Sequence, residues 1–157
     1  MRKVNLIILA VVAIYLLAAP LALGQGGNPP ASTKESGADP EAIVQAQVEA
    51  YNARNIDAFL ATYTDDAQLF EHPAKLLASG LAQMRERYTA RFKEPNLHAV
   101  ILKRIVMGNV VLDHERVTRT FPEGTGTADA VAIYEVQNGK INKVWLIFGP
   151  KILDAKP

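Results

Sequence analysis

The fold is decided by residues 128–148, which read ADAVAIYEVQNGKINKVWLIF. Small or apolar residues occupy every second position of residues 128–136, an alternation typical of a β-strand. Residues 140–148 form a second run that is apolar on both faces toward its end. The Asn138-Gly139 pair between the two runs indicates a two-residue hairpin turn. We therefore predict two antiparallel strands joined at these two residues.

Two further strands are predicted before this hairpin. Residues 97–107 and 110–121 are rich in Val, Ile and Thr, and Gly108-Asn109 separates them. The stretch Glu123-Gly124-Thr125-Gly126 then supplies a turn before the hairpin. Period-two segments bounded by such turn residues indicate consecutive hairpins. The C-terminal half is thus predicted to be a four-stranded meander.

Helices are predicted ahead of this meander. Asp39-Pro40 favours the start of a helix that ends near residue 54, because aspartate caps a helix and proline suits its first turn. Asn55 can cap a second helix with an apolar stripe that reaches Tyr63. Residues 81–92 form a third helix, after a short strand at residues 68–72. Helices followed by a meander indicate an α+β fold in which the helices cover one face of a curved sheet.

The N-terminus differs in character from this domain. Arg2-Lys3 precede a nearly unbroken apolar run from Leu6 to Leu23, which is typical of a secretory signal peptide. The run is also just long enough to span a bilayer, so an uncleaved anchor at residues 4–23 is the alternative. We expect an exported protein, periplasmic or extracellular, with this organisation: signal peptide or anchor 1–24, flexible linker 25–40, domain 41–150 and tail 151–157.

Charge and composition exclude several classes of partner. Loss of residues 1–24 removes two of the 17 basic residues and none of the 16 acidic ones, so the remaining chain has a net charge of −1. Without a basic cluster, nucleic acid is not expected as a partner. The chain has no cysteine and therefore no disulfide frame and no thiol nucleophile. Its three histidines are scattered, so neither a metal nor a cofactor is expected.

The chain resembles the cone-shaped NTF2-like superfamily, particularly its SnoaL-like and ketosteroid isomerase-like branch. The resemblance covers residues 41–150 and is carried by residues 51–57, Asp65-Asp66-Ala67, Ser79-Gly80, residues 138–141 and the final strand 144–149. It implies three N-terminal helices packed on a curved, mostly antiparallel sheet. Such a cone either fills with side chains or stays open for a ligand. Function does not follow from the fold, because this fold hosts enzymes, binders and adaptors.

The resemblance points to two rival catalytic residues. The isomerases of this branch place a catalytic aspartate just before a proline at the end of the first strand. An ungapped count from Asp65-Asp66-Ala67 selects Glu71, whereas a count back from Pro73 selects His72. Strand alternation sends the two side chains to opposite faces, so only one can point inward. We favour Glu71 as a general base.

The oxyanion hole of the isomerases is not reproduced. The positions that match its tyrosine and its protonated aspartate are Gln47 and Ala132, and an alanine can donate no hydrogen bond. Loss of such a donor typically costs about a hundred- to a thousand-fold in rate. Steroid isomerisation by the known mechanism is therefore not expected. The resemblance implies a mostly apolar pocket whose candidate wall residues are Gln47, Tyr51, Tyr63, Tyr88 and Phe148.

One predicted strand has a charged interior. With period two, Glu115 and Arg119 share one face, while His114 and Arg116 share the other. Glu115 and Arg119 could form a polar pair on the cavity wall that orients a ligand carboxylate or carbonyl. The alternative is cross-strand ion pairing on a wet or dimer-forming face of the sheet.

Three functions remain open at this point. The first is an exported domain that binds a small hydrophobic molecule. The second is a cofactor-free proton-transfer enzyme of the isomerase, cyclase or dehydratase type, with Glu71 as its base. The third is a dimeric interaction module with a filled cone. Residues 144–148 are apolar on both faces, which predicts that both faces of this strand are covered. The resemblance implies that the second cover is another subunit, so we expect a homodimer through the outer sheet face. A membrane partner is expected only if the N-terminal segment stays uncleaved.

Overall fold

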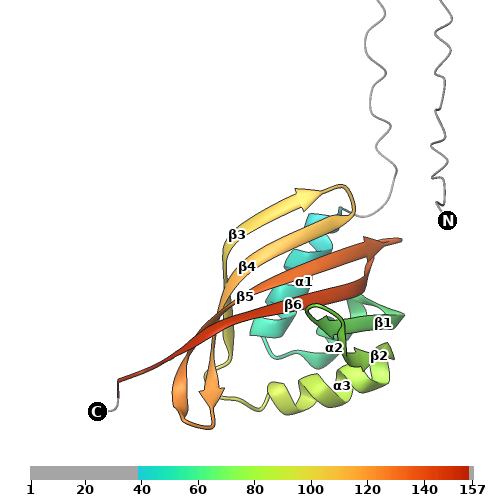
Figure 1. Ribbon diagram of the computed structural model, residues 1–157. Coiled ribbons are helices and arrows are strands. Elements are labelled where there is room, and N and C mark those ends of the chain that lie inside the picture. Colours follow the sequence, from blue (N-terminus) through green and yellow to red (C-terminus); the bar gives the residue numbers. More distant parts are fainter. Residues whose placement is uncertain (1–38, 156–157) are drawn as a thin grey trace, which may run out of the picture. The chain divides into compact units, whose positions relative to one another are not determined.

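A computed structural model describes residues 39–155 (Figure 1). The predicted signal peptide or anchor and nearly all of the predicted linker lie outside these residues. The helices are α1 (Pro40–Asn52), α2 (Ile56–Ala61) and α3 (Gly80–Arg91). The strands are β1 (Tyr63–Glu71), β2 (Lys75–Ser79), β3 (His98–Met107), β4 (Val110–Phe121), β5 (Gly124–Gln137) and β6 (Lys140–Leu153). Within residues 39–155, no helix has the length and apolarity needed to cross a membrane.

The first two helices begin at the predicted caps. The Asp39 carboxylate accepts a hydrogen bond from the Glu41 backbone N–H at 3.0 Å. The Asn55 side chain likewise accepts one from the Ala58 N–H at 3.0 Å. Each cap satisfies a backbone donor that the first turn of a helix leaves unpaired. Both helix starts are thus confirmed.

All six strands form one sheet in the order β2-β1-β6-β5-β4-β3. Strand β1 pairs in parallel with β6, and every other pair is antiparallel. Gln137 and Lys140 are register partners on either side of the predicted hairpin turn. Asn138 and Gly139 have φ of +52° and +75°, the left-handed conformation that this turn needs. The predicted α+β fold and its meander are confirmed.

Several element boundaries differ from the prediction, and β5 begins at Gly124, inside the stretch 123–126 that was predicted as a turn. Tyr63 opens β1 instead of continuing α2, because it pairs with Ile141 on β6 and the neighbouring Thr62 carbonyl accepts from the Ile141 N–H at 2.8 Å. Strand β2 was not predicted, since a five-residue edge strand has too few positions to show a period. Strand β6 continues to Leu153 and includes Lys151, which we had assigned to a tail.

The three helices lie on one side of the sheet, which curves around them (Figure 1). Their packing is centred on aromatic and aliphatic side chains from α1, α2, β1 and α3, of which Val44, Phe59, Leu69 and Met84 are fully buried. The Phe59 and Tyr88 rings pack 4.3 Å apart between centroids. This core fills the closed end of the cone. It does not extend into the space between α1, α3 and the long strands.

Candidate functional site: a cavity inside the cone

A cavity of about 490 Å³ lies between the helices and the inner face of the sheet. Its wall is mainly aromatic and aliphatic, with contributions from α1, α3 and five of the six strands. Small side chains at Ala128 and Ala130 of β5 keep the sheet from filling this space. The cavity is lined by all seven residues that the sequence assigned to a pocket: Gln47, Tyr51, Tyr63, Tyr88, Glu115, Arg119 and Phe148. That they bind a ligand stays a prediction.

The charged residues of β4 have a different role on each face of the strand, one for each of the two interpretations. Glu115, Val117 and Arg119 line the cavity. On the other face, Arg116 donates from Nε and Nη2 to the Asp129 carboxylate at 2.7 and 3.0 Å. Cross-strand ion pairing therefore occupies the outer face, while Glu115 and Arg119 lie inside the cone.

Among residues 39–155, Glu115 is the only carboxylate that lines the cavity. Burial raises the pKa of Glu115 to about 7, and the nearby charge of Asp113 adds to the increase. Within residues 39–155 its carboxylate has no hydrogen-bond or ion-pair partner. Near neutral pH this side chain is therefore present in both protonation states, and it can accept or donate a proton inside the cavity.

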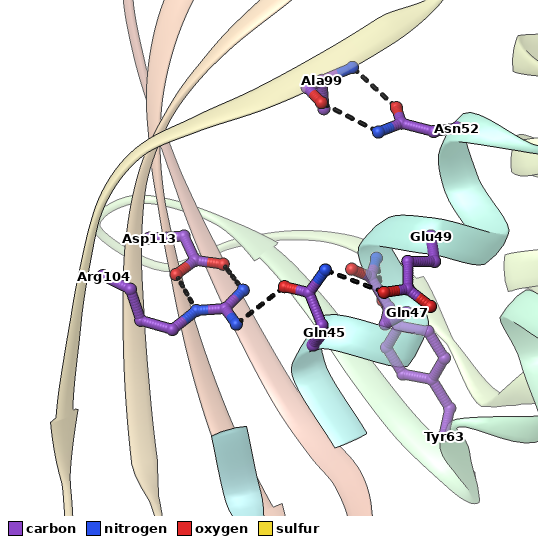
Figure 2. Close-up of polar contacts among 8 residues, drawn as sticks. All are labelled: Gln45, Gln47, Glu49, Asn52, Tyr63, Ala99, Arg104 and Asp113. Carbon is purple, nitrogen blue, oxygen red and sulfur yellow. Dashed lines mark hydrogen bonds and ion pairs between the residues drawn. The ribbon is translucent and has the colours of Figure 1, made fainter. Parts of the chain in front are cut away.

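Asp113, two residues before Glu115, is fully buried and does not line the cavity. The Nε and Nη2 atoms of Arg104 on β3 donate hydrogen bonds to the two carboxylate oxygens of Asp113, each at 2.7 Å (Figure 2). Arg104 Nη1 also donates to the Gln45 side chain of α1 at 3.0 Å. This paired group fixes α1 against the sheet and places a negative charge close to Glu115 without entering the site.

Gln47 lines the cavity, and its side chain lies beside Tyr63 (Figure 2). Its Nε2 donates to the Tyr63 hydroxyl at 3.0 Å, and its Oε1 is buried without a hydrogen-bond partner. An amide rotated by 180° would exchange these two atoms and leave an unpaired donor in place of the acceptor. In either orientation, one polar group of the glutamine stays without a hydrogen-bond partner.

Four tyrosines surround the same space: Tyr63 and Tyr134 are buried, and Tyr51 and Tyr88 are partly buried. Burial raises the pKa of Tyr88 to about 12 and raises the pKa values of the other three further. Their hydroxyls therefore stay neutral at physiological pH and can act as hydrogen-bond donors within an otherwise apolar wall.

Arg119 lies farther along β4, next to Glu94 in the connection between α3 and β3. Its Nη2 contacts the Glu94 carboxylate at 3.2 Å, while its Nε is buried without a partner. Burial lowers the pKa of Arg119, and the neighbouring Arg91 lowers it further. Arg119 therefore lines the cavity as a guanidinium whose hydrogen bonds are incompletely satisfied.

The structure does not place Glu71 or His72 in the cavity. Glu71 is the register partner of Leu146, which lines the cavity, so alternation assigned its side of the sheet correctly. However, the Glu71 side chain is 39% exposed and pairs with Lys75 at 3.2 Å. His72 is exposed beyond the end of β1. The carboxylate that lines the cavity is Glu115, whereas Glu71 lies outside it and is partly exposed.

Sequence reasoning missed Arg87, Arg91, Tyr134 and Lys151, all of which line the cavity. The two arginines are four residues apart and flank Tyr88 on α3, so helical spacing could have placed them together. Tyr134 occupies the same set of alternate positions on β5 as Ala128 and Ala130, so its side chain points to the same face. Strand alternation could therefore have identified it. Lys151 could not be found, because β6 was predicted to end before it.

The sequence comparison agrees with this geometry. Residues 44–144, nearly the whole described domain, match the SnoaL-like domain family. The chain belongs to the SnoaL-like domain family. A search among curated proteins found no match.

Solved structures with the same fold come from several bacteria. An uncharacterized cystatin-fold protein of Novosphingobium aromaticivorans is 28% identical, with a TM-score of 0.65 over 71% of this chain and 99% of that one. An NTF2-like protein of unknown function from Cytophaga hutchinsonii is 17% identical, with a TM-score of 0.61 over 74% and 95%. A hypothetical protein with a ketosteroid isomerase-like fold from Catenulispora acidiphila, solved with trimethylamine, is 16% identical, with a TM-score of 0.58 over 66% and 82%. The fold of this SnoaL-like chain is therefore that of the NTF2-like proteins.

Proposed function

We propose that this SnoaL-like domain binds a small, mainly hydrophobic molecule inside its cone. The observation that carries the proposal is the open cavity of about 490 Å³, lined largely by aromatic and aliphatic side chains. This size and composition are typical of small-molecule sites, which bury most of the ligand and orient it with a few polar groups. The side chains of Gln47, Glu115 and Arg119 are polar groups on this wall. An open cavity also argues against a module with a filled cone.

Two neighbouring substitutions on β5 test the proposal. Ala130 lines the cavity, whereas Val131 faces the opposite side of the sheet. Ala130→Phe is expected to fill the cavity and abolish binding of small molecules that copurify with the protein, as detected by mass spectrometry. Val131→Phe adds a ring to the outer face and should leave them bound. Equal ligand content in two variants that melt like the wild type would contradict the proposal.

The second candidate function is proton-transfer catalysis with Glu115 as the acid or base. Its support is a single carboxylate on the cavity wall that has a pKa of about 7 and no partner. This value suits general acid–base catalysis at neutral pH. The neutral tyrosine hydroxyls nearby could stabilise a developing oxyanion, the role that Ala132 cannot fill.

A homodimer through the outer sheet face is part of the same proposal. Apolar side chains form a continuous cross-strand row on that face, and each is the register partner of the next: Ile105, Leu112, Ile133, Trp145 and Phe70. All five are at least partly exposed. The Phe70 and Trp145 rings stack at 5.9 Å and present a flat surface. A second copy of the chain would bury this row.

Export of the protein rests on the apolar N-terminal segment alone. The expected mature protein begins near Gln25 and is periplasmic or extracellular. N-terminal sequencing of the native protein that finds Met1 intact would indicate an uncleaved anchor.

A further inference from the structure

Basic side chains outnumber acidic ones on the cavity wall. Arg87 and Arg91 of α3, Arg119 of β4 and Lys151 of β6 all line the space, and Glu115 is their only acidic counterpart. An apolar ligand of no charge would give no reason for four cationic groups at the edge of a hydrophobic cavity, since burying charge without a partner is costly.

Carboxylates outside the cavity compensate only part of this charge. Glu94 is shared by Arg91, at 3.4 Å, and by Arg119, at 3.2 Å. Glu123 pairs with Lys151. Arg87 has no ion-pair partner within residues 39–155. Among these groups the basic residues exceed the acidic ones by one when Glu115 is ionised, and by two when it is protonated.

Glu94 uses only part of the hydrogen-bonding capacity of these arginines. Glu94 contacts Arg91 and Arg119 with the same oxygen, Oε1, and the buried Nε of Arg119 makes no hydrogen bond. A guanidinium carries five N–H donors in a planar fork that matches the two oxygens of a carboxylate. A ligand carboxylate at this position would satisfy donors that the protein leaves unused.

We propose that the ligand is an organic anion, a hydrophobic monocarboxylate whose carboxylate lies against Arg87, Arg91 and Arg119 and whose apolar body extends into the cavity. The inference rests on the proposed binding function and adds to it the chemical class of the ligand. The apolar body meets Val117, Ala130 and Leu146, which line the same space.

Glu115 makes this binding sensitive to pH. The titratable or charged groups that face it from the packed elements are Asp113 on its own strand, Tyr51, Tyr63, Tyr88 and Tyr134 around the cavity, and the basic residues of the wall. Because the tyrosines stay neutral, Glu115 is the group on the wall that changes charge near neutral pH. Its ionised form repels a bound carboxylate, so anion affinity should fall as pH rises through about 7.

A pair of matched probes tests the charge of the ligand. 2-Naphthoate and 2-naphthamide have nearly the same shape and differ in charge. Isothermal titration calorimetry at low salt should show 2-naphthoate binding about tenfold more tightly, the gain typical of a charge-assisted arginine pair. Arg87→Gln should reduce this preference several-fold. Arg85→Gln is the matched control, because Arg85 lies on the same helix, pairs with Asp57 at 2.8 Å and does not line the cavity.

The possible results separate this inference from the function on which it rests. Equal affinity for the two probes would overturn the anion inference and leave a hydrophobic cavity in place. Binding of neither probe would overturn both proposals. A preference for 2-naphthoate that Arg85→Gln reduces as much as Arg87→Gln would assign it to surface charge and overturn the proposed site.

The pH dependence supplies an independent check. 2-Naphthoate stays ionised from pH 6 to pH 8, so a change in its affinity reports the protein. The wild type should bind it several-fold more weakly at pH 8 than at pH 6, and Glu115→Gln should bind it equally at both. A pH dependence that persists unchanged in Glu115→Gln would exclude Glu115 as the coupled group.

Discussion

Glu115 is the residue on which catalysis can be tested. If Glu115 moves protons, the protein should speed deuterium exchange at the α-carbons of a cyclic ketone such as 2-tetralone, followed by NMR. The rate should rise with pH through about 7, because the ionised carboxylate is the base. Glu115→Gln should lose at least about a hundred-fold of this rate. Glu71→Gln removes an exposed carboxylate and serves as the control, so equal losses in both variants would exclude the assignment.

The same side chain should also make stability depend on pH. A carboxyl group whose pKa is raised in the folded protein favours folding when protonated, and that contribution is lost as pH rises from the unfolded value near 4.5 through about 7. Between pH 5 and pH 8, the unfolding free energy of the wild type should therefore fall by about 1–3 kcal/mol relative to that of Glu115→Gln. Urea denaturation at both pH values measures this difference. An unchanged difference would place Glu115 in contact with bulk water.

At the scale of single residues, prediction succeeded where the alternation of side chains along a strand decides which residues share a face. Alternation along β4 placed Glu115 and Arg119 on one face, but the sequence could not tell which face was inward because both carry charged side chains. Residues on the neighbouring strands decide which face of β4 points into the cone. Arg104 pairs with Asp113 on the inner face, and Asp129 pairs with Arg116 on the outer face. Glu71 lies outside the cavity, where it pairs with Lys75 on the unpredicted strand β2.

At the scale of elements, Asn52 at the end of α1 joins that helix to the edge strand β3. Its Nδ2 donates to the Ala99 carbonyl at 2.9 Å, and its Oδ1 accepts from the Ala99 N–H at 2.7 Å (Figure 2). Asn52→Ala leaves both backbone groups unpaired and should cost about 2–3 kcal/mol in urea denaturation. Asn96→Ala removes only an exposed contact of 3.5 Å to Thr125 and should stay within about 0.5 kcal/mol. Similar losses in both variants would show that this clamp adds nothing.

Elements were predicted best where local chemistry and tertiary structure agree. The Asn138-Gly139 turn and the caps Asp39 and Asn55 act within a few residues, so the sequence alone specified them. Strand β1 was predicted too short because its first pairing, Tyr63 with Ile141, joins residues far apart in the chain. The sequence pattern of a short segment carries no information about a pairing partner that is far away in the chain.

At the scale of the whole molecule, the apolar row on the outer sheet face predicts self-association. Sedimentation at micromolar concentration should give the mass of a dimer. Ile133→Lys places a charge at the centre of the row and should give a monomer that keeps its fold, because Ile133 is only half-buried. Thr120→Lys changes an exposed residue near the end of β4 and should remain dimeric. A monomeric wild type would contradict the predicted interface.

The position of β6 within the sheet also sets when the domain can fold. The last strand in the sequence lies between β1 and β5, so β1 and β2 join the meander only through β6. A nascent chain that has not yet emerged from the ribosome through residue 153 lacks this central strand and cannot close its sheet. Pairing of Tyr63 with Ile141 makes that closure strongly non-local, which slows folding. The domain is therefore expected to fold only after residue 153 has emerged, in a late step that forms the sheet and the cavity together.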